Sequence, residues 1–216
     1  MSQATVRIIV DGQPVTAGAG QSLLQACLAA GIYIPNLCFT EDQDRPSASC
    51  RLCFVDIGGL PGPVTACTRV AVDGLQVRTD TQAVRRLQRS ALRLLLSVHC
   101  VECKKCPANR SCGLQQIARF LGVGLKHHPL ERVLKPTAVD RSHPFLDYYP
   151  NRCVLCGKCV QACRAHRGQP ILAFCQRGFD TIVRAFPAGE GGTSGCADCS
   201  RCIDICPVGA LQRRNA

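Results

Sequence analysis

Apolar side chains recur at every second position near the start of the chain, which is the pattern of a half-buried strand. This alternation covers residues 6–10 and is followed directly by a hairpin-turn signal, Asp11-Gly12. A helix is predicted next, because a good N-cap residue, Ser22, precedes a stripe of apolar positions. Gly31 suits the left-handed residue that ends such a helix.

Later apolar runs predict further strands and a longer helix. The runs at 52–57 and 64–72 read as strands that are separated by glycine and proline. Hairpin, helix and strands together predict a small α+β unit over residues 1–80, with the helix packed across one sheet. Residues 81–96 predict an amphipathic helix. Its expected apolar face consists of Val84, Leu87, Ala91, Leu94 and Leu95.

A second face of this long helix is basic. It carries Arg85, Arg89 and Arg93, spaced four residues apart. We interpret these side chains as a solvated helix surface, and a docking surface for an acidic partner is the alternative.

The second half of the chain is organised around cysteines. A compact cysteine segment is predicted at 81–125 and a proline-containing linker at 126–150. Two similar cysteine runs follow in 151–216, which indicates an internal duplication. Between these runs, 171–174 and 181–183 are expected to form a hairpin.

Eighteen cysteines in 216 residues approach the level at which disulfides or metals dominate a fold. A disulfide scaffold would need an oxidising compartment and a signal sequence, but residues 1–10 predict a strand instead. No run approaches the ~18 apolar residues that cross a bilayer. We therefore expect a cytoplasmic protein without a transmembrane segment, in which clustered cysteines bind metal or act as redox centres.

The formal charge of +11 raises nucleic-acid binding as a possible function. A zinc-stabilised nucleic-acid-binding protein is therefore the alternative from a different class. Three tyrosines, seven phenylalanines and no tryptophan provide no basic and aromatic stacking platform. Thiolate-ligated clusters, which carry negative charge, would offset much of the basic surplus, so we expect no nucleic-acid partner.

The first cysteine set has the spacing C-x11-C-x2-C-x13-C. Its members are Cys38, Cys50, Cys53 and Cys67. Three thiolates near one loop and a fourth from a later strand end suit a 2Fe-2S cluster, which takes two sulfurs on each iron. Structural zinc is the alternative, but zinc prefers two close pairs, and Cys38 has no near partner in the sequence.

The second set has the spacing H-x3-C-x2-C-x5-C. Its members are His99, Cys103, Cys106 and Cys112. Four ligands within fourteen residues suit either a tetrahedral zinc or a 4Fe-4S cluster with histidine on one iron, and spacing alone does not separate the two.

The third and fourth sets come from the run C-x2-C-x2-C-x3-C, which occurs twice. In bacterial two-cluster ferredoxins the fourth cysteine of each run binds the other cluster. We therefore assign Cys153, Cys156, Cys159 and Cys206 to one 4Fe-4S cluster. Its neighbour takes Cys163, Cys196, Cys199 and Cys202.

The remaining candidate ligands are interpreted as ordinary packing or surface residues. The cysteines outside the four sets are Cys27, Cys100 and Cys175, and we expect them to act as small buried apolar side chains. The histidines in this group are His127, His128, His143 and His166. The sequence shows no nucleotide fingerprint, nucleophile with a base or spare carboxylate pair, so no substrate-activating catalytic site is predicted.

From Thr5 to Leu211 the chain resembles one known iron-sulfur family. The resemblance rests on the order of the four sets and on the phrases CRLC at 50–53, CGLQ at 112–115 and CPVGAL at 206–211. The family comprises the amino-terminal region of the large iron-sulfur subunit of complex I and the accessory domains of iron-only hydrogenases. It also includes the diaphorase small subunit of bidirectional NAD-linked nickel-iron hydrogenases.

The resemblance implies a β-grasp 2Fe-2S ferredoxin domain at 1–80, a histidine-ligated 4Fe-4S segment at 81–125 and a two-cluster ferredoxin-like domain at 151–216. It favours a 4Fe-4S cluster over zinc at His99, which gives one 2Fe-2S and three 4Fe-4S clusters in total. One departure is Ala48, where relatives commonly have glycine, because alanine is less comfortable at positive φ.

Because the chain ends at Ala216 with both carboxy-terminal cysteine runs, it most resembles the electron-transfer subunit of an NAD-linked nickel-iron hydrogenase. The resemblance implies a hetero-oligomer whose other members are a flavin-containing NAD(H) diaphorase subunit and the hydrogenase small and large subunits. The alternative of the same class is a subunit of an NAD-linked formate dehydrogenase or a complex I-like oxidoreductase.

Overall fold

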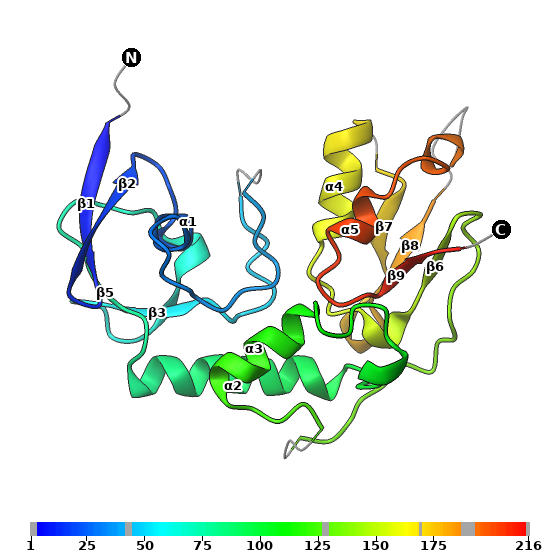
Figure 1. Cartoon of the computed structure of the whole chain (residues 1–216), viewed down its shortest axis with the longest axis horizontal. Helices are drawn as coiled ribbons and strands as arrows, with labels where there is room; N and C mark the ends of the chain where they lie inside the picture. Colours follow the sequence, from blue (N-terminus) through cyan, green and yellow to red (C-terminus); the bar gives the residue numbers. More distant parts are fainter. Residues whose placement is uncertain (1–3, 42–44, 127–129, 169, 187–192, 215–216) are drawn as a thin grey trace. The chain divides into compact units, whose positions relative to one another are not determined.

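The computed structural model describes residues 4–41, 45–126, 130–168, 170–186 and 193–214. It divides into two compact units (Figure 1). Unit 1 contains Met1–Arg93 and Phe120–Val123. Unit 2 contains Leu94–Arg119 and Gly124–Ala216.

Unit 1 is built on one five-stranded sheet with the order β2-β1-β5-β3-β4. The strands are β1 (Thr5–Val10), β2 (Gln13–Gly18), β3 (Phe54–Ile57), β4 (Val64–Thr65) and β5 (Gln76–Arg78). β1 forms an antiparallel hairpin with β2 and pairs in parallel with β5. The predicted hairpin is confirmed, and the mixed helix and strand fold agrees with the α+β class. The predicted strand at 64–72 is shorter, because the chain turns into a 3-10 helix, η1 (Ala66–Thr68), directly after β4.

Helix α1 (Leu23–Ala29) begins at the predicted N-cap. The Gln25 backbone N–H donates to the Ser22 Oγ at 3.2 Å, and the Ser22 N–H donates to the Gln25 Oε1 at 2.9 Å. This reciprocal pair is a capping box, which satisfies donors that the first helical turn leaves free. Gly31 has the expected left-handed φ of 75°. The buried face of α1, including Cys27, packs into the core of the unit.

Helix α2 (Gln82–Ser97) confirms the predicted long helix, but part of its predicted apolar face is wrong. Leu94 is 61% exposed, whereas Gln88 is fully buried. The reason is a hydrogen bond, because the Gln88 amide donates to the Phe54 carbonyl at 3.0 Å. A satisfied polar side chain therefore occupies a position that the apolar pattern could not identify.

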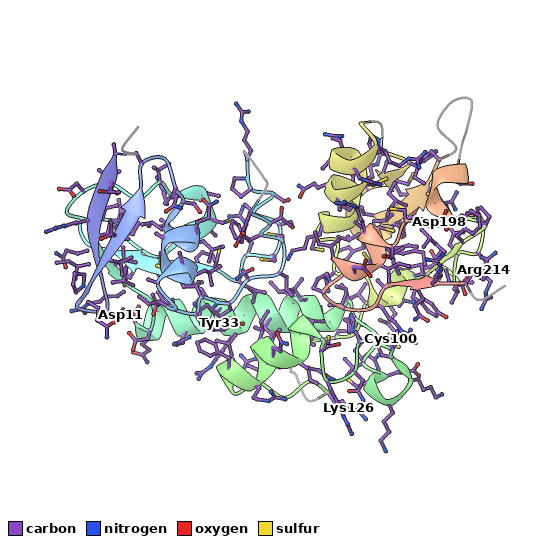
Figure 2. All side chains as sticks on the ribbon, turned by 45° about the horizontal axis from the view of Figure 1, so that its top comes forward. Asp11, Tyr33, Cys100, Lys126, Asp198 and Arg214 are labelled. Carbon is purple, nitrogen blue, oxygen red and sulfur yellow. The ribbon has the colours of Figure 1, made fainter. Side chains whose placement is uncertain are left out.

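Two arginines of α2 are held by the end of α3 (Gly113–Leu121) and are not simply solvated. The Arg85 guanidinium lies 4.6 Å from the centre of the Phe120 ring, and the Arg89 Nε donates to the Leu121 carbonyl at 2.9 Å. Phe120 also meets Tyr33, labelled in Figure 2, edge to face at 4.7 Å between ring centres. These contacts fasten the Phe120–Val123 segment to unit 1.

The carboxy-terminal part of unit 2 contains two antiparallel strand pairs. One pair joins β6 (Leu146–Tyr148) to β9 (Leu211–Arg213) (Figure 1). The inner pair, which lies between these strands in the sequence, joins β7 (Leu172–Cys175) to β8 (Ile182–Ala185). The inner pair is the hairpin expected between the two cysteine runs. β6 lies within the segment 126–150 that the proline pattern assigned to a linker.

Helices complete the predicted duplication. α4 (Lys158–Arg167) contains the last two cysteines of the first run, Cys159 and Cys163, and α5 (Arg201–Asp204) overlaps the end of the second run. Each half therefore reads strand, cysteine run, helix, strand. Further 3-10 helices are η2 (Cys103–Lys105), η3 (Pro150–Arg152), η4 (Gly178–Asp180) and η5 (Ser194–Cys196). None of the helices in the described ranges combines the length and apolar composition that crossing a bilayer requires.

Candidate metal centres

The structure gathers the four thiols of the first set into two pairs within unit 1. The Cys38 and Cys50 sulfurs lie 3.4 Å apart, and the Cys53 and Cys67 thiols share a second hydrogen bond. All four side chains are at most 5% exposed. η1 positions Cys67, because the Ala66 N–H donates to the Cys53 carbonyl at 2.8 Å. Two close pairs of sulfurs suit a cluster that takes two thiolates on each of two irons.

Within each sulfur pair the pKa values of the two thiols shift in opposite directions. The hydrogen bond from Cys50 lowers the pKa of Cys38 to about 5, while the pKa of Cys50 is raised by the same contact and by burial. The pKa of Cys67 is likewise lowered by the Cys53 thiol, and that of Cys53 is raised. Metal ligation requires both members of each pair to be thiolates, so iron must displace the proton of the thiol whose pKa is raised.

The loop that carries this set has left-handed backbone at two residues with side chains. Ala48 has a φ of 50° and Arg51 a φ of 52°. Such a conformation costs an ordinary residue roughly 1–2 kcal/mol. The loop therefore keeps the backbone shape that glycine favours although the sequence has alanine at position 48, and strain of this kind is concentrated at functional sites.

The second set surrounds the link between α2 and α3 in unit 2. His99 follows α2, Cys103 begins η2, and Cys112 directly precedes α3. Burial is the first cause that raises the pKa of Cys112, and the neighbouring Cys106 and Cys103 thiols raise it further.

The His99 imidazole has the properties of a metal ligand. The side chain is 8% exposed, and burial lowers its pKa to about 4, so the ring is neutral at physiological pH. Its Nδ1 is buried and has no hydrogen-bond partner among the described residues. An unpartnered buried nitrogen is costly unless something binds it. A neutral imidazole with a buried, unpartnered nitrogen therefore suits the ligand role that the sequence predicts for His99.

The third and fourth sets line two separate cavities in the duplicated part of unit 2. One cavity is lined by Cys153, Cys156, Cys159 and Cys206. The other is lined by Cys163, Cys196, Cys199 and Cys202. In each cavity three thiols come from one cysteine run and the fourth from the other run, which is the crossed arrangement that the sequence predicts.

Burial in these cavities disfavours the thiolate form of several of the cysteines without a metal. Burial raises the pKa of Cys156 to about 12 and that of Cys202 to about 12. It also raises the pKa of Cys153 and Cys159. The positive charge of bound iron would reverse this preference.

Backbone amides support the sulfurs of the first of these cavities. The Leu155 N–H donates to the Cys153 Sγ, and the Ala210 N–H donates to the Cys206 Sγ, each at 3.4 Å. Leu155 reaches this position through a left-handed φ of 53°. Such donors stabilise negative charge on a cluster ligand.

The second set and the Cys153 set approach each other closely inside unit 2. The Gly113 N–H donates to the Pro207 carbonyl at 2.8 Å, and the Cys106 thiol donates to the Val208 carbonyl at 3.8 Å. A Cβ on Gly209 would lie 2.9 Å from the Ala108 Cβ and 3.2 Å from the Cys106 Sγ. The segment after Cys206 therefore packs directly against the loop that carries Cys106.

The leftover cysteines differ in their surroundings. Cys27 is fully buried in the core of unit 1, and burial raises its pKa to about 11, as expected for a packing residue. Cys100, labelled in Figure 2, is half-buried, and its N–H donates to the Asn151 carbonyl at 2.6 Å. Cys175 is half-buried on β7.

The histidines that we interpret as surface or packing residues also differ from one another in their surroundings. His143 is buried, and His166 is exposed but lines the Cys163 cavity. His127 and His128 lie outside the described residues. Within the described ranges, no group of three or more His, Cys, Asp or Glu side chains is arranged to hold a single metal ion.

Sequence reasoning missed one polar group at these sites, the hydroxyl of Tyr148, which lines the Cys153 cavity. Tyr148 reaches the cavity because β6 pairs with β9. No local signal in the sequence predicts that pairing.

Two family models match consecutive parts of the chain. Residues 3–82 match a 2Fe-2S iron-sulfur cluster binding domain. Residues 88–130, which include the whole second set, match the NADH-ubiquinone oxidoreductase-G iron-sulfur binding region. Together with the fold and the gathered thiols, these matches define the chain as an iron-sulfur electron-transfer protein with 2Fe-2S and 4Fe-4S binding regions.

Curated relatives extend the similarity over nearly the whole chain. An NADH-quinone oxidoreductase subunit of Rhizobium meliloti is 35% identical over 96% of this chain. The alpha subunit of an NADPH-Fe(3+) oxidoreductase of Geobacter sulfurreducens is 31% identical over 95% of it. In each case the chain spans 24% of the relative's length. The HndD subunit of an NADP-reducing hydrogenase of Solidesulfovibrio fructosivorans is 29% identical over 98% of this chain, which spans 36% of that relative.

A solved structure matches at similar length. It is the crystal structure of an NAD+-reducing [NiFe]-hydrogenase in the H2-reduced state, whose matching chain is 33% identical, with a TM-score of 0.85. The match covers 99% of this chain and 89% of that one. This chain therefore belongs to the family of iron-sulfur subunits that includes this hydrogenase chain and the matching subunits of NADH-quinone oxidoreductases. The family resemblance drawn from the residues is thereby confirmed.

Proposed function

We propose that this chain relays electrons between a flavin-containing NAD(H) diaphorase subunit and the hydrogenase small and large subunits of an NAD-linked nickel-iron hydrogenase. The observation that carries the proposal is the match to a chain of an NAD+-reducing [NiFe]-hydrogenase over 89% of that chain's length. The relay chemistry would reside in iron-sulfur clusters, which exchange single electrons. The chain itself would bind these clusters and exclude water from them.

The proposed cofactors are one 2Fe-2S and three 4Fe-4S clusters, each held by one of the four sets. The 2Fe-2S ligands are Cys38, Cys50, Cys53 and Cys67. The ligands of the histidine-ligated 4Fe-4S cluster are His99, Cys103, Cys106 and Cys112. The crossed 4Fe-4S sites use Cys153, Cys156, Cys159 and Cys206, and Cys163, Cys196, Cys199 and Cys202. Support comes from the sulfur pairs of the first set, the orphaned Nδ1 of His99 and the two four-thiol cavities.

Within unit 2 the second and third sets lie close enough together to offer a path for electrons. Cys106 of the second set contacts the Val208 carbonyl, and Val208 follows Cys206 of the third set by two residues. In addition, the Gly113 N–H, directly after Cys112, donates to the carbonyl of Pro207, directly after Cys206, at 2.8 Å. This backbone hydrogen bond remains when the cysteines bind iron, and it favours electron exchange between the two sites. Many thiolate ligands also require a reducing compartment, so we place the protein in the cytoplasm.

Metal analysis of the anaerobically purified protein tests the cofactor proposal. We expect about 14 iron atoms and about 14 acid-labile sulfides per chain, because the clusters carry two and three times four of each. Zinc without iron or sulfide would reject it. Co-purifying chains test the partner proposal, since a nickel-containing partner supports the hydrogenase assignment.

A complex I-like assembly is the second candidate, because the relative with 35% identity is a subunit of an NADH-quinone oxidoreductase. Co-purification with quinone-reducing subunits, or with a molybdopterin-containing formate dehydrogenase chain, would replace the hydrogenase assignment. The iron-sulfur content would be the same in each case.

A further inference from the structure

The hydroxyl of Tyr148 lies inside the cavity of the Cys153 set. Tyr148 is the last residue of β6 and pairs with Leu211 of β9. Its side chain is 6% exposed and lines the cavity together with Cys153 and apolar residues that include Val183 and Val208. A tyrosine hydroxyl in such an apolar environment needs hydrogen-bond partners.

The structure provides two partners. The Val183 backbone N–H donates to the Tyr148 hydroxyl oxygen at 3.2 Å, which fixes the oxygen in place. The second partner is the Cys153 sulfur, which lines the same cavity as the hydroxyl. A cluster ligand is a thiolate and carries no proton, so in the loaded protein the hydroxyl must be the donor to the Cys153 sulfur.

The duplicated partner site offers a comparison within the same domain. Among the described residues that line the Cys163 cavity, no side chain carries a hydroxyl. The polar side chains there, apart from the cysteines, are His166, Arg167 and Arg201. The hydroxyl donor therefore distinguishes one cavity from its twin.

We propose that Tyr148 sets the reduction potential of the 4Fe-4S cluster at Cys153, Cys156, Cys159 and Cys206 by donating a hydrogen bond to Cys153. This inference rests on the proposed function, because it requires that cluster. One-electron reduction adds negative charge to the cluster and its sulfurs, and a donor aimed at a sulfur stabilises the reduced form. Tyr148 therefore makes the potential of this cluster more positive and leaves its twin unchanged.

The test is a redox titration of the cluster-loaded full chain, followed by electron paramagnetic resonance under argon. The signal that Cys156→Ser removes identifies the relevant cluster. We expect Tyr148→Phe to keep the full iron content and to shift the midpoint potential of that signal to a more negative value. The other two 4Fe-4S signals should titrate as in the wild type.

Tyr149→Phe is the matched control, because it removes the same hydroxyl from the neighbouring residue. The ring of Tyr149 packs against the Arg152 guanidinium at 4.2 Å, a contact that phenylalanine retains. We expect no shift of any potential in this variant. An equal shift in both variants would assign the effect to general packing and overturn the role of Tyr148.

A second experiment tests the same inference if the Tyr148→Phe variant fails to keep its cluster. The protein has three tyrosines, so biosynthetic incorporation of fluorotyrosine changes few sites and makes each hydroxyl a stronger donor. We expect the same signal to shift to a more positive potential. Unchanged potentials with full iron content would reject the inference alone, whereas a protein without iron would reject the proposed function together with it.

Discussion

Gly209 lies so close to Cys106 that an added Cβ would stand 3.2 Å from the sulfur and 2.9 Å from the Ala108 Cβ. Its φ of 64° is also in the left-handed region. Both properties follow from the packing of the Pro207–Ala210 segment against the loop of the second set. Glycine at this position is therefore required by the approach of two cluster sites as well as by the turn.

Gly209→Ala should push these two segments apart. We expect a loss of about 1–3 kcal/mol in stability from overpacking, with a further ~1 kcal/mol from the backbone conformation. The measurement is the thermal unfolding of the cluster-loaded protein, together with the signal of the histidine-ligated cluster. Gly62→Ala is the control, because its Cβ would meet no atom within 4 Å, and it should change neither quantity.

The crossed cavities predict which cysteine variants share a phenotype. Cys163→Ser should damage the same 4Fe-4S signal as Cys199→Ser, although Cys163 belongs to the other sequence run. Cys206→Ser should match Cys159→Ser in the same way. Electron paramagnetic resonance of the reduced proteins distinguishes these outcomes, and the 2Fe-2S signal should survive in all four. Grouping by sequence run instead, Cys163 with Cys159, would contradict the crossed ligation.

Cys175→Ser is the matched control for this series. Cys175 lies on β7 of the same domain, outside both four-thiol cavities as described. We expect it to keep every cluster signal. Loss of a cluster in this variant would show that the assigned ligand sets are incomplete.

His143 predicts a dependence of stability on pH. The Phe145 N–H donates to its Nδ1 at 3.1 Å, and burial, followed by the nearby Arg214 charge, lowers the pKa of the ring below 6.5. The unfolded chain therefore binds a proton that the folded chain resists. Stability from this group is present above pH 6.5 and is lost as the pH falls below that value.

His143→Asn tests this dependence, because its Oδ1 can still accept from Phe145. Denaturant unfolding of the cluster-loaded protein between pH 7.5 and pH 5.5 should show a smaller loss of stability in the variant than in the wild type. Parallel pH profiles for the two proteins would contradict a buried neutral imidazole.

The capping box of α1 predicts a purely structural effect. Ser22→Ala removes the acceptor for the Gln25 N–H and should lower the free energy of unfolding by about 1 kcal/mol. Urea denaturation measures this loss. Ser90→Ala, at an exposed position within α2, should change stability by less than half as much, and its cluster content should match that of Ser22→Ala.

Local signals in the sequence predicted the features that depend on neighbouring residues. The hairpin around Asp11-Gly12, the cap at Ser22 and the left-handed Gly31 each require only a few adjacent residues. The cysteine sets were also readable, because thiols at short spacings have few other uses in a reducing compartment.

Features that depend on contacts between distant parts of the chain could not be predicted from the sequence. Gln88 is buried because the Phe54 carbonyl, far away in the sequence, accepts its amide. Arg85 and Arg89 lie against Phe120 and Leu121, which no helical periodicity indicates. The role that we propose for Tyr148 requires the pairing of β6 with β9, which are the first and last strands of the duplicated domain.

The mixed lining of the two cavities bears on how the protein matures. As the ribosome releases the chain, Cys153, Cys156 and Cys159 emerge before any other thiol of the duplicated domain, yet their cavity lacks its fourth sulfur until Cys206 has been made. The site that begins first is therefore completed last. With the proposed crossed ligand sets, neither half of the domain supplies all four ligands of a cluster, and each inserted cluster would link the two halves through its ligands.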